Sequence, residues 1–392
     1  MPTAATTAGG TAQTSRARGG QNQQVMPVIP FVRASAEHRE PAGIDVSRQL
    51  TTADQDLGVF DIPAYGYVRR IVLLVTAAGG TGGAPAVTVN EDAPWTTLKN
   101  IALTEPNGAV LSSWTSGYGT HLSCKWGGYK DPAGADFKAS PTFAAIAATF
   151  ASYSYMTAIP VEINLRDGLG SLPNQNAAAT FKLRLTLAKV GDIVGGTLPS
   201  TLPTVRVRAF AECWDQPESQ TAGAPNQLTP PAMNTTQFWT EQTYAVAAGA
   251  NTIRLTRVGN YVRNLIFVLR RTAGTRANGQ SDWADPVTVY LDTRPLDIIE
   301  KNNWLHQMYE RTGFGATLGT QVPAADAPQG LDNGVFVYDF THEFDGLLGR
   351  ENRDLWLPTL GSTRLEIQGN FANAGSLTVY TNDVAIAGNV FM

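Results

Sequence analysis

The sequence has few of the residues that build metal centres and redox sites. Its 392 residues include two cysteines, Cys124 and Cys213, which form no CxxC motif and no zinc-binding spacing. Two free thiols in a reducing compartment are the expected state. The four histidines, at positions 38, 121, 306 and 342, fall in no HxH or HExxH motif. We therefore expect neither a metal ion nor a cofactor.

Long apolar runs and charged residues are also scarce. The longest strongly apolar run, Ile71 to Ala78, is far shorter than the about 20 residues of a membrane-spanning helix. No N-terminal stretch has the pattern of a signal peptide, so the sequence predicts a product made in the cytoplasm. Charged residues make up 16% of the chain against a typical ~25%, which indicates a surface largely covered by other protein. The net charge of −4 does not favour nucleic-acid binding.

Residues 1–45 differ in composition from the rest of the chain. They are rich in Ala, Thr, Gly and Gln and hold no acidic residue before Glu37, which predicts a flexible arm. Within the arm, Val25 to Val32 is an apolar patch that two prolines keep extended, so we expect a docking strand there and not a helix. Three arginines are the candidates for contact with an inner surface, through nucleic acid or anionic lipid headgroups: Arg16, Arg18 and Arg33.

The remaining chain is predicted to form strands in two blocks. The counts of 38 Gly and 23 Pro suit many short strands joined by turns. Apolar and polar residues alternate over 181–187 and 205–213, which is typical of half-buried antiparallel strands. Residues 215–234 are rich in proline and lack periodicity, which predicts a linker. The predicted domains are therefore 46–214 and 235–392.

Two short helices are expected among the strands. Apolar residues within 143–150 recur at i, i+3, i+4 and i+7, the spacing of one helix face. Asp297, with Glu300 three residues later, resembles the start of a second helix, and Gly313 can end it.

The two blocks repeat each other in sequence order. Four pairs of segments match at offsets of 194, 198 to 200, 178 and 182: 67–73 with 261–267, 85–89 with 285–289, 167–170 with 345–349, and 181–185 with 363–367. One such match can arise by chance, because β-strands in general are built from similar residue types. Four in order predict a duplicated β-sandwich domain.

Two strands of this repeat are apolar on both faces. Residues 71–75 and 265–269 contain no charged side chain, although a sandwich strand buries only alternate residues in its own core. Their outward side chains therefore need cover from the other domain or from a neighbouring subunit, since an open apolar face favours aggregation.

Several stretches of the first half follow a recognisable order and spacing: 59–63 leading into 68–78; Asn107-Gly108 followed by 116–122; 159–161, 167–170 and 181–187; and 205–217. In these stretches the sequence resembles the double jelly-roll major capsid proteins of membrane-containing icosahedral bacteriophages, the tectivirus and adenovirus lineage. The likeness covers most of the first half in order and rests on spacing more than on a sharp motif.

The resemblance implies an all-β fold of two tandem eight-stranded jelly-roll β-sandwiches with a few short helices in loops. It implies a non-enzymatic capsid protein whose pseudo-hexameric homotrimers tile an icosahedral virion shell and are assembled in the host cytoplasm. The implied partners are neighbouring capsomers, vertex (penton) and minor capsid proteins and an internal lipid membrane, with no specific nucleic acid. The Thr/Ala/Gly-rich arm departs from the amphipathic helix of that pattern.

Two other functions stay open on the residues. Tryptophans that stack on sugars would indicate a carbohydrate-binding spike or receptor-binding protein of a phage, although such residues more often fill sandwich cores; they are Trp95, Trp114, Trp126 and Trp304. A polar group of Asp339, His342, Glu343 and Asp345 would suit a hydrolase or a metal site. The Asp-Gly-Leu at 345–347 also occurs at 167–169, which favours a repeated turn over a catalytic site.

Overall fold

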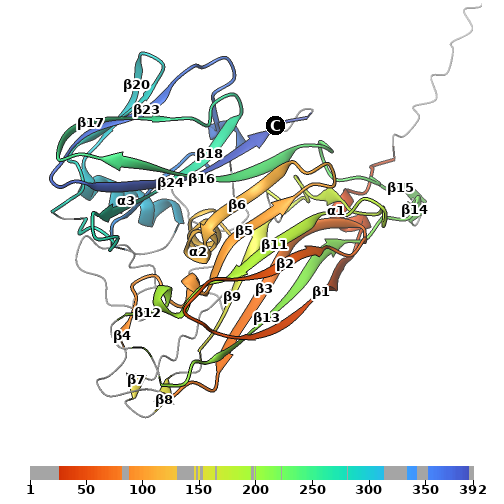
Figure 1. Ribbon diagram of the computed structural model, residues 1–392. Helices are drawn as coiled ribbons and strands as arrows, with labels where there is room; N and C mark the ends of the chain where they lie inside the picture. Colours follow the sequence, from red (N-terminus) through yellow and green to blue (C-terminus); the bar gives the residue numbers. More distant parts are fainter. Residues whose placement is uncertain are drawn as a thin grey trace, which may run out of the picture.

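Two β-sandwiches lie side by side in the computed structural model of the chain (Figure 1). Each is a jelly roll of eight main strands in two sheets, and we name them roll 1 and roll 2. The structure describes residues 26–81, 88–129, 145–146, 149–150, 153–163, 166–195, 198, 200–221, 223–279, 281–312, 333–341 and 352–387.

Roll 1 consists of two antiparallel sheets, 1a and 1b. Sheet 1a has the order β1 (Glu37–Gln49), β13 (Thr204–Trp214), β3 (Tyr67–Ala78) and β9 (Tyr153–Pro160), and β10 (Leu172–Pro173) also pairs with β3. Sheet 1b has the order β2 (Gln55–Asp61), β11 (Lys182–Leu187), β5 (Leu98–Thr104) and β6 (Val110–Ser116).

Roll 2 repeats this topology. Sheet 2a has the order β16 (Thr236–Val246), β24 (Gly375–Ala385), β18 (Tyr261–Arg271) and β21 (Val335–Asp339), and β22 (Leu357–Pro358) pairs with the start of β18 as β10 does with β3. Sheet 2b has the order β17 (Gly249–Leu255), β23 (Leu365–Phe371), β19 (Val287–Leu291) and β20 (Arg294–Ile299).

Short elements fill the connections between these strands. The helical ones are α1 (Phe31–Ala34), η1 (Trp95–Thr97), α2 (Gly117–Trp126), η2 (Val190–Asp192), α3 (Lys301–Thr312) and η4 (Arg353–Leu355). The extended ones are the pairs β4 (Thr88–Val89) with β12 (Val194–Gly195), β7 (Ala145–Ile146) with β8 (Thr149–Phe150), and β14 (Gln220–Thr221) with β15 (Ala224–Pro225).

The topology confirms two of the four predicted repeat pairs. Residues 67–73 and 261–267 lie in β3 and β18, and 181–185 and 363–367 lead into β11 and β23, which hold the same places in the two rolls. Of the pair 85–89 with 285–289, residues 85–87 lie outside the described part of the chain. The match is wrong for Thr88 and Val89, because they form β4, which pairs with β12 outside the sandwich, whereas β19 is a main strand of sheet 2b. Residues 345–349 of the remaining pair lie outside the described part of the chain.

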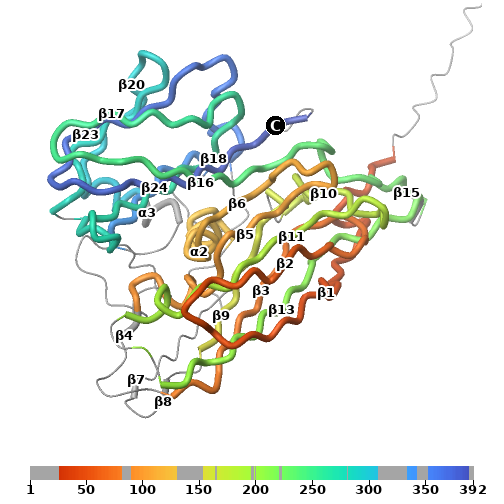
Figure 2. The backbone as a smooth tube through the Cα atoms, in the orientation of Figure 1, coloured from red at the N-terminus to blue at the C-terminus, as the bar shows by residue number. Residues whose placement is uncertain are grey.

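The two rolls share one continuous sheet. Trp239 of β16 pairs in parallel with Ser112 of β6, so sheets 1b and 2a join edge to edge. The chain itself crosses from roll 1 to roll 2 at the end of the molecule that carries α1 and β15 (Figure 2). Two main apolar clusters result, one within roll 2 and a larger one that includes roll 1 and one face of sheet 2a.

The predicted arm boundary at residue 45 differs from the structure. Residues 37–45 belong to β1, whose ladder with β13 starts at Glu37 opposite Trp214. The segment is poor in apolar residues because β1 is the edge strand of sheet 1a, where Pro41 is also tolerated. The extended patch before it also ends in one helical turn, α1, which the prolines did not predict.

Both helix predictions need correction. The described residues of 143–150 lie in the paired strands β7 and β8, so a helix there is wrong; an Ala-rich apolar run has no strong preference between the two structures. The second helix exists as α3 but starts at Lys301, because Asp297 is held in the β20 ladder opposite Val289. The Lys301 backbone N–H instead donates to Asp285 Oδ1 at 3.2 Å.

Candidate interaction surfaces

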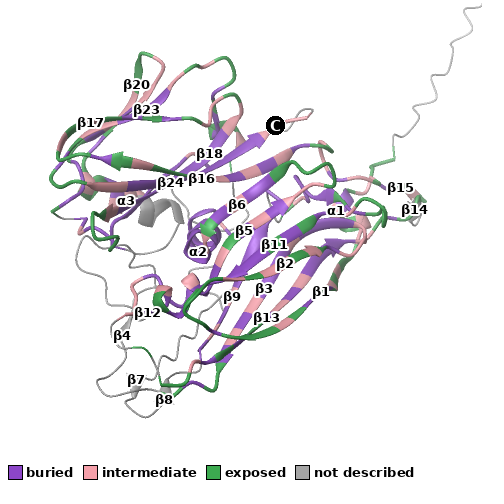
Figure 3. Ribbon diagram, viewed as in Figure 1, coloured by how far each residue is buried: buried purple, intermediate pink, exposed green. Residues whose placement is uncertain are grey.

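Helix α2 is enclosed between the two rolls. All ten of its residues are buried, and Figure 3 shows it as a buried element at the junction. Ser116 caps it by accepting a hydrogen bond from the Tyr118 backbone N–H. A Cβ atom on Gly119 would lie 2.6 Å from a ring carbon of Tyr380 and 2.8 Å from one of Trp114. Only glycine permits this close approach of α2 to sheet 2a.

The outward face of sheet 2a is covered by roll 1. Ile266 and Val268 of β18 are 0% exposed and belong to the same apolar cluster as Tyr118 and Leu122 of α2. The neighbouring residues of this face, Val335, Val337 and Tyr380, belong to it as well. The prediction that the outward side chains of 265–269 need cover is therefore confirmed, and the cover comes from the other roll.

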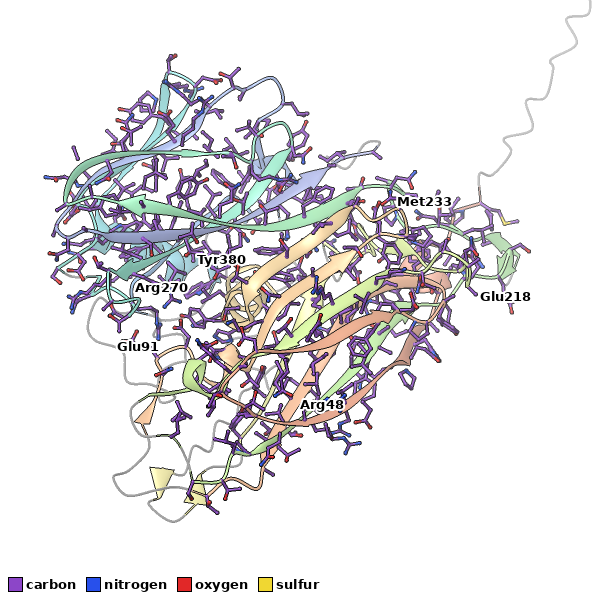
Figure 4. All side chains as sticks on the ribbon, in the orientation of Figure 1. Arg48, Glu91, Glu218, Met233, Arg270 and Tyr380 are labelled. Atoms are coloured by element: carbon purple, nitrogen blue, oxygen red, sulfur yellow. The ribbon has the colours of Figure 1, made fainter. Side chains whose placement is uncertain are left out.

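Ion pairs connect the two rolls at one end of their junction. Asp92, which precedes η1, pairs with Arg270 of β18 and with Arg276 Nε at 2.9 Å. The Arg276 backbone N–H donates to Glu91 Oε2 at 2.7 Å, and its Nη1 donates to the Tyr118 hydroxyl at 2.9 Å. Burial by itself would lower the pKa of Arg270. The nearby Asp92 carboxylate has the opposite effect and contributes to a net shift upward, so the pKa of Arg270 is raised. Figure 4 shows Glu91 and Arg270 close together at this junction.

A buried polar network lies near the start of β18, at the end of the strand opposite to Arg270. Arg263 Nη1 donates to Asn382 Oδ1 at 2.6 Å, and Gln237 Nε2 donates to the Tyr129 hydroxyl at 2.8 Å. The amide of Gln237 also donates to the backbone carbonyl of Glu162 at 2.9 Å. Because buried polar groups are costly without partners, this network fixes how the rolls sit against each other.

A buried ion pair lies where sheet 1a meets the linker. Arg69 Nε donates to Glu162 Oε2 at 2.6 Å, and Arg69 Nη1 lies 2.7 Å from Glu37 Oε1. The guanidinium stacks on the ring of Trp214, 4.0 Å from its centroid. Burial raises the pKa of Glu162 to about 7, against the lowering effect of Arg69.

An open polar pocket of about 670 Å³ lies between the rolls. Its lining includes Lys99 and Asp192 of roll 1, which form an ion pair of 2.9 Å, and Glu241 of roll 2. The Thr115 backbone N–H donates to Glu241 Oε2 at 2.7 Å, while burial raises the pKa of Glu241. Within the described residues, no group of three or more His, Cys, Asp or Glu side chains could hold a metal ion.

Of the three arginines predicted to contact an inner surface, one is described. Arg33 lies exposed on α1, whereas Arg16 and Arg18 lie outside the described residues. The apolar patch before α1 docks on the linker, because the Ile29 N–H donates to the Pro225 carbonyl at 2.9 Å. Phe31 is 1% exposed and packs edge-on against Tyr67, with ring centroids 5.3 Å apart.

Apolar side chains are exposed near this end of the molecule. Met26 and Val28 of the arm are 55% and 56% exposed, and Leu228 and Met233 of the linker are 39% and 43% exposed. Figure 4 places Met233 and Glu218 at the end that carries α1. No helix in the described part of the chain combines the length and apolarity needed to cross a membrane.

The tryptophans proposed as sugar platforms are core residues. Trp95, Trp114, Trp126 and Trp304 are each 1% exposed, so none can stack on a glycan. Both cysteines are buried and free, as predicted from their spacing, and burial raises the pKa of Cys213 to about 12.

The proposed acidic cluster is described only at Asp339. This carboxylate is buried and accepts hydrogen bonds from the backbone N–H and the hydroxyl of Thr341, so it holds a turn after β21. His342, Glu343 and Asp345 lie outside the described residues.

The residues that join the two rolls through ion pairs were not predicted from the sequence. Asp92 lies in a loop with no periodic pattern, and Arg276 follows β18 in a turn. The available signal was the charge of Arg263 and Arg270 at the two ends of an apolar strand. Such charges are rarely buried without a partner, but their partners lie more than 100 residues away in sequence, at Asn382 and Asp92.

No family model matches the chain, and no curated protein matches it in sequence. Solved structures do match it. The crystal structure of the STIV MCP has a TM-score of 0.59 at 12% identity and covers 90% of this chain and 97% of that chain. The major capsid protein P2 from bacteriophage PM2 has a TM-score of 0.52 at 8% identity, covering 91% and 100%. The PBCV-1 virus capsid protein has a TM-score of 0.55 at 11% identity, covering 89% and 93%.

At such low identities the likeness concerns the fold. It extends over nearly the whole length of both chains, so the two rolls match as a tandem pair and not as one sandwich alone. The resemblance inferred from the sequence is thereby confirmed at the level of the fold: the chain is a double jelly roll of the kind that these capsid proteins have.

Proposed function

We propose that the chain is a structural major capsid protein, and that three copies form a pseudo-hexameric homotrimer that tiles an icosahedral virion shell. The observation that carries the proposal is the tandem double jelly roll, matched over about 90% of the chain at TM-scores of 0.52 to 0.59 by structures described as capsid proteins. The function needs no catalytic group, since rigid sandwiches present broad side faces that pack against each other.

The arrangement within one chain supports a closed ring. Roll 1 covers the outward face of sheet 2a, so that a surface of roll 1 that includes α2 contacts a different surface, a sheet face, of roll 2. A contact of this head-to-tail type generates a ring when repeated with the correct rotation. Three copies supply six rolls, which suits a pseudo-hexagonal block.

Further partners are proposed from the same role. Neighbouring capsomers, vertex proteins and minor capsid proteins would contact the loops and side faces of the trimer. The end that carries α1 and the exposed Met26, Val28 and Met233 suits the inner side of a shell. There Arg33, with Arg16 and Arg18, would contact adjacent subunits or the headgroups of an internal membrane. Assembly in the host cytoplasm and a bacteriophage origin belong to the same proposal.

The duplicated topology also supports the domain division. Roll 1 would comprise residues 37–214 and roll 2 residues 236–385, with 215–235 as the linker that holds the β14–β15 pair.

Light scattering of the purified protein tests the proposal. We expect a particle of about three times the chain mass of 41.9 kDa at micromolar concentration, and flat pseudo-hexagonal blocks or shells by electron microscopy. A stable monomer under the same conditions would contradict it.

A further inference from the structure

The outward faces of sheets 1a and 2a carry the same apolar patch at the same register. The offset of 194 that relates β3 to β18 places Val72 at the position of Ile266 and Leu74 at that of Val268. Across the sheet, Phe210 pairs with Val72 as Tyr380 pairs with Ile266. On the other side, Ala158 and Met156 pair with Val72 and Leu74 as Val337 and Val335 pair with Ile266 and Val268.

The two patches differ in how far they are covered. The five residues of the sheet 2a patch are 0 to 6% exposed because roll 1 packs on them. In the sheet 1a patch, Leu74, Met156 and Phe210 remain half-buried. Arg208, which pairs with Leu74, keeps a buried Nε with no hydrogen-bond partner among the described residues. A half-covered apolar patch beside a buried guanidinium nitrogen that lacks a hydrogen bond within the described residues indicates a contact that is incomplete in one chain.

The element that would complete this contact is identified by the duplication. In roll 1, α2 joins β6 to β9, packs on β9 and covers β18. In roll 2, α3 holds the same place, because it follows β20, precedes β21 and packs on β21. All residues of α2 are buried, whereas Asn302, Asn303 and His306 of α3 are exposed.

From these observations we infer that the outward face of sheet 1a, around Val72, Leu74, Met156 and Phe210, binds roll 2 of a second copy of this chain, with α3 of that copy lying on the patch. The contact repeats between copies the one that α2 makes within the chain. The inference rests on the proposed function, to which it adds the surface and the occupant. Ion pairs that Glu212 forms with Arg39 and Arg70 border the patch and keep its rim polar.

Crosslinking between two single-cysteine variants tests which elements meet. Leu74→Cys and Asn303→Cys are placed on separate chains and co-expressed, and a short bifunctional maleimide is added. Because Cys124 and Cys213 are buried, the introduced thiols are the accessible ones. We expect a crosslinked species of twice the chain mass for this combination. Each variant alone, and Val59→Cys combined with Asn303→Cys, should form little of it, because Val59 lies exposed on sheet 1b.

A charge placed on the patch tests whether the contact holds the oligomer together. Leu74→Glu should lower the trimer fraction at micromolar concentration by about tenfold or more, because burying the carboxylate in the contact costs more desolvation free energy than a pair with its cross-strand neighbour Arg208 returns. Val59→Glu is the matched control and should leave the trimer intact. Circular dichroism verifies that both variants fold, and if Leu74→Glu does not fold, the crosslinking result decides.

The possible results separate the two proposals. A wild-type protein that is monomeric would overturn the capsid-trimer proposal itself. A wild-type trimer that survives Leu74→Glu and gives no crosslink between positions 74 and 303 would overturn only the assignment of this surface. The surface would then be left to another occupant, such as a minor capsid protein.

Discussion

At single positions in the junction of the rolls, neighbouring aromatic rings lie so close to the backbone that only glycine fits. Gly119 sits where any side chain would enter the ring of Tyr380, and Gly127 sits where a Cβ atom would lie 2.9 Å from Trp239. The aromatic rings therefore come close to the α2 backbone itself. Small residues at such positions do not reflect flexibility, because α2 is buried over its whole length.

Gly119→Ala is expected to destabilise the protein by about 1–3 kcal/mol. The strain of overpacking against Tyr380 should exceed the about 1 kcal/mol that alanine gains as a helix former. Gly191→Ala is the control, since a Cβ atom there meets nothing within 4 Å. Denaturant unfolding at one fixed protein concentration measures both variants. Equal midpoints for the two would contradict the close approach.

Glu162 should make stability depend on pH. Its pKa is raised by burial to about 7 from an ordinary value of 4.5, so the folded state holds the proton more tightly than the unfolded state. The stabilisation from this group is therefore complete below about pH 4.5 and is lost as the pH rises through about 7. Glu162→Gln stays neutral, so its stability relative to the wild type should increase by about 1–3 kcal/mol over that range. Unfolding curves at pH 5 and pH 8 measure this, and an unchanged difference would refute it.

At the scale of elements, the ion pairs around Asp92 connect a loop of roll 1 to the end of β18. Arg276 is 1% exposed at its side chain and Arg270 22%, and both use the same carboxylate. The pairs thus join two elements that share no ladder of backbone hydrogen bonds.

Asp92→Asn is expected to cost about 3–5 kcal/mol of unfolding free energy, because two largely buried guanidinium groups lose their counter-charge. Asp45→Asn removes an exposed pair with Arg206 and should leave the midpoint almost unchanged. Urea unfolding compares the two variants. A similar small effect for both would mean that the Asp92 pairs do not hold the junction.

The whole molecule behaves as one packed body because each roll completes the other. The outward face of sheet 2a lies in the apolar cluster of roll 1, and β6 pairs with β16. Roll 2 on its own would therefore expose Ile266, Val268 and Tyr380 together.

Residues 235–392 expressed alone should aggregate or bind a hydrophobic dye strongly. The same fragment with Ile266→Thr and Val268→Thr should bind much less dye, because these side chains face outward and the inner core keeps Leu265 and Phe267. Dye fluorescence and gel filtration give the comparison. A soluble fragment without dye binding would argue that the rolls are independent.

The strand-rich architecture, the duplication and the need to cover both faces of 265–269 could be predicted from the sequence alone. Alternation and repeat offsets are local properties, so they can be read without coordinates. They also predicted that the cysteines are free and favoured a core role for the tryptophans.

Which surfaces meet depends on contacts that form in three dimensions. Helix α3 starts at Lys301 and not at the predicted cap Asp297, because Asp297 pairs with Val289 in the ladder between β19 and β20. Residues 37–45 became an edge strand because Trp214 and its neighbours offer them partners. Asp92 pairs with Arg270 and Arg276, which are separated from it by 178 residues or more in the sequence. These outcomes depend on contacts between distant segments, for which a one-dimensional pattern holds no geometric information.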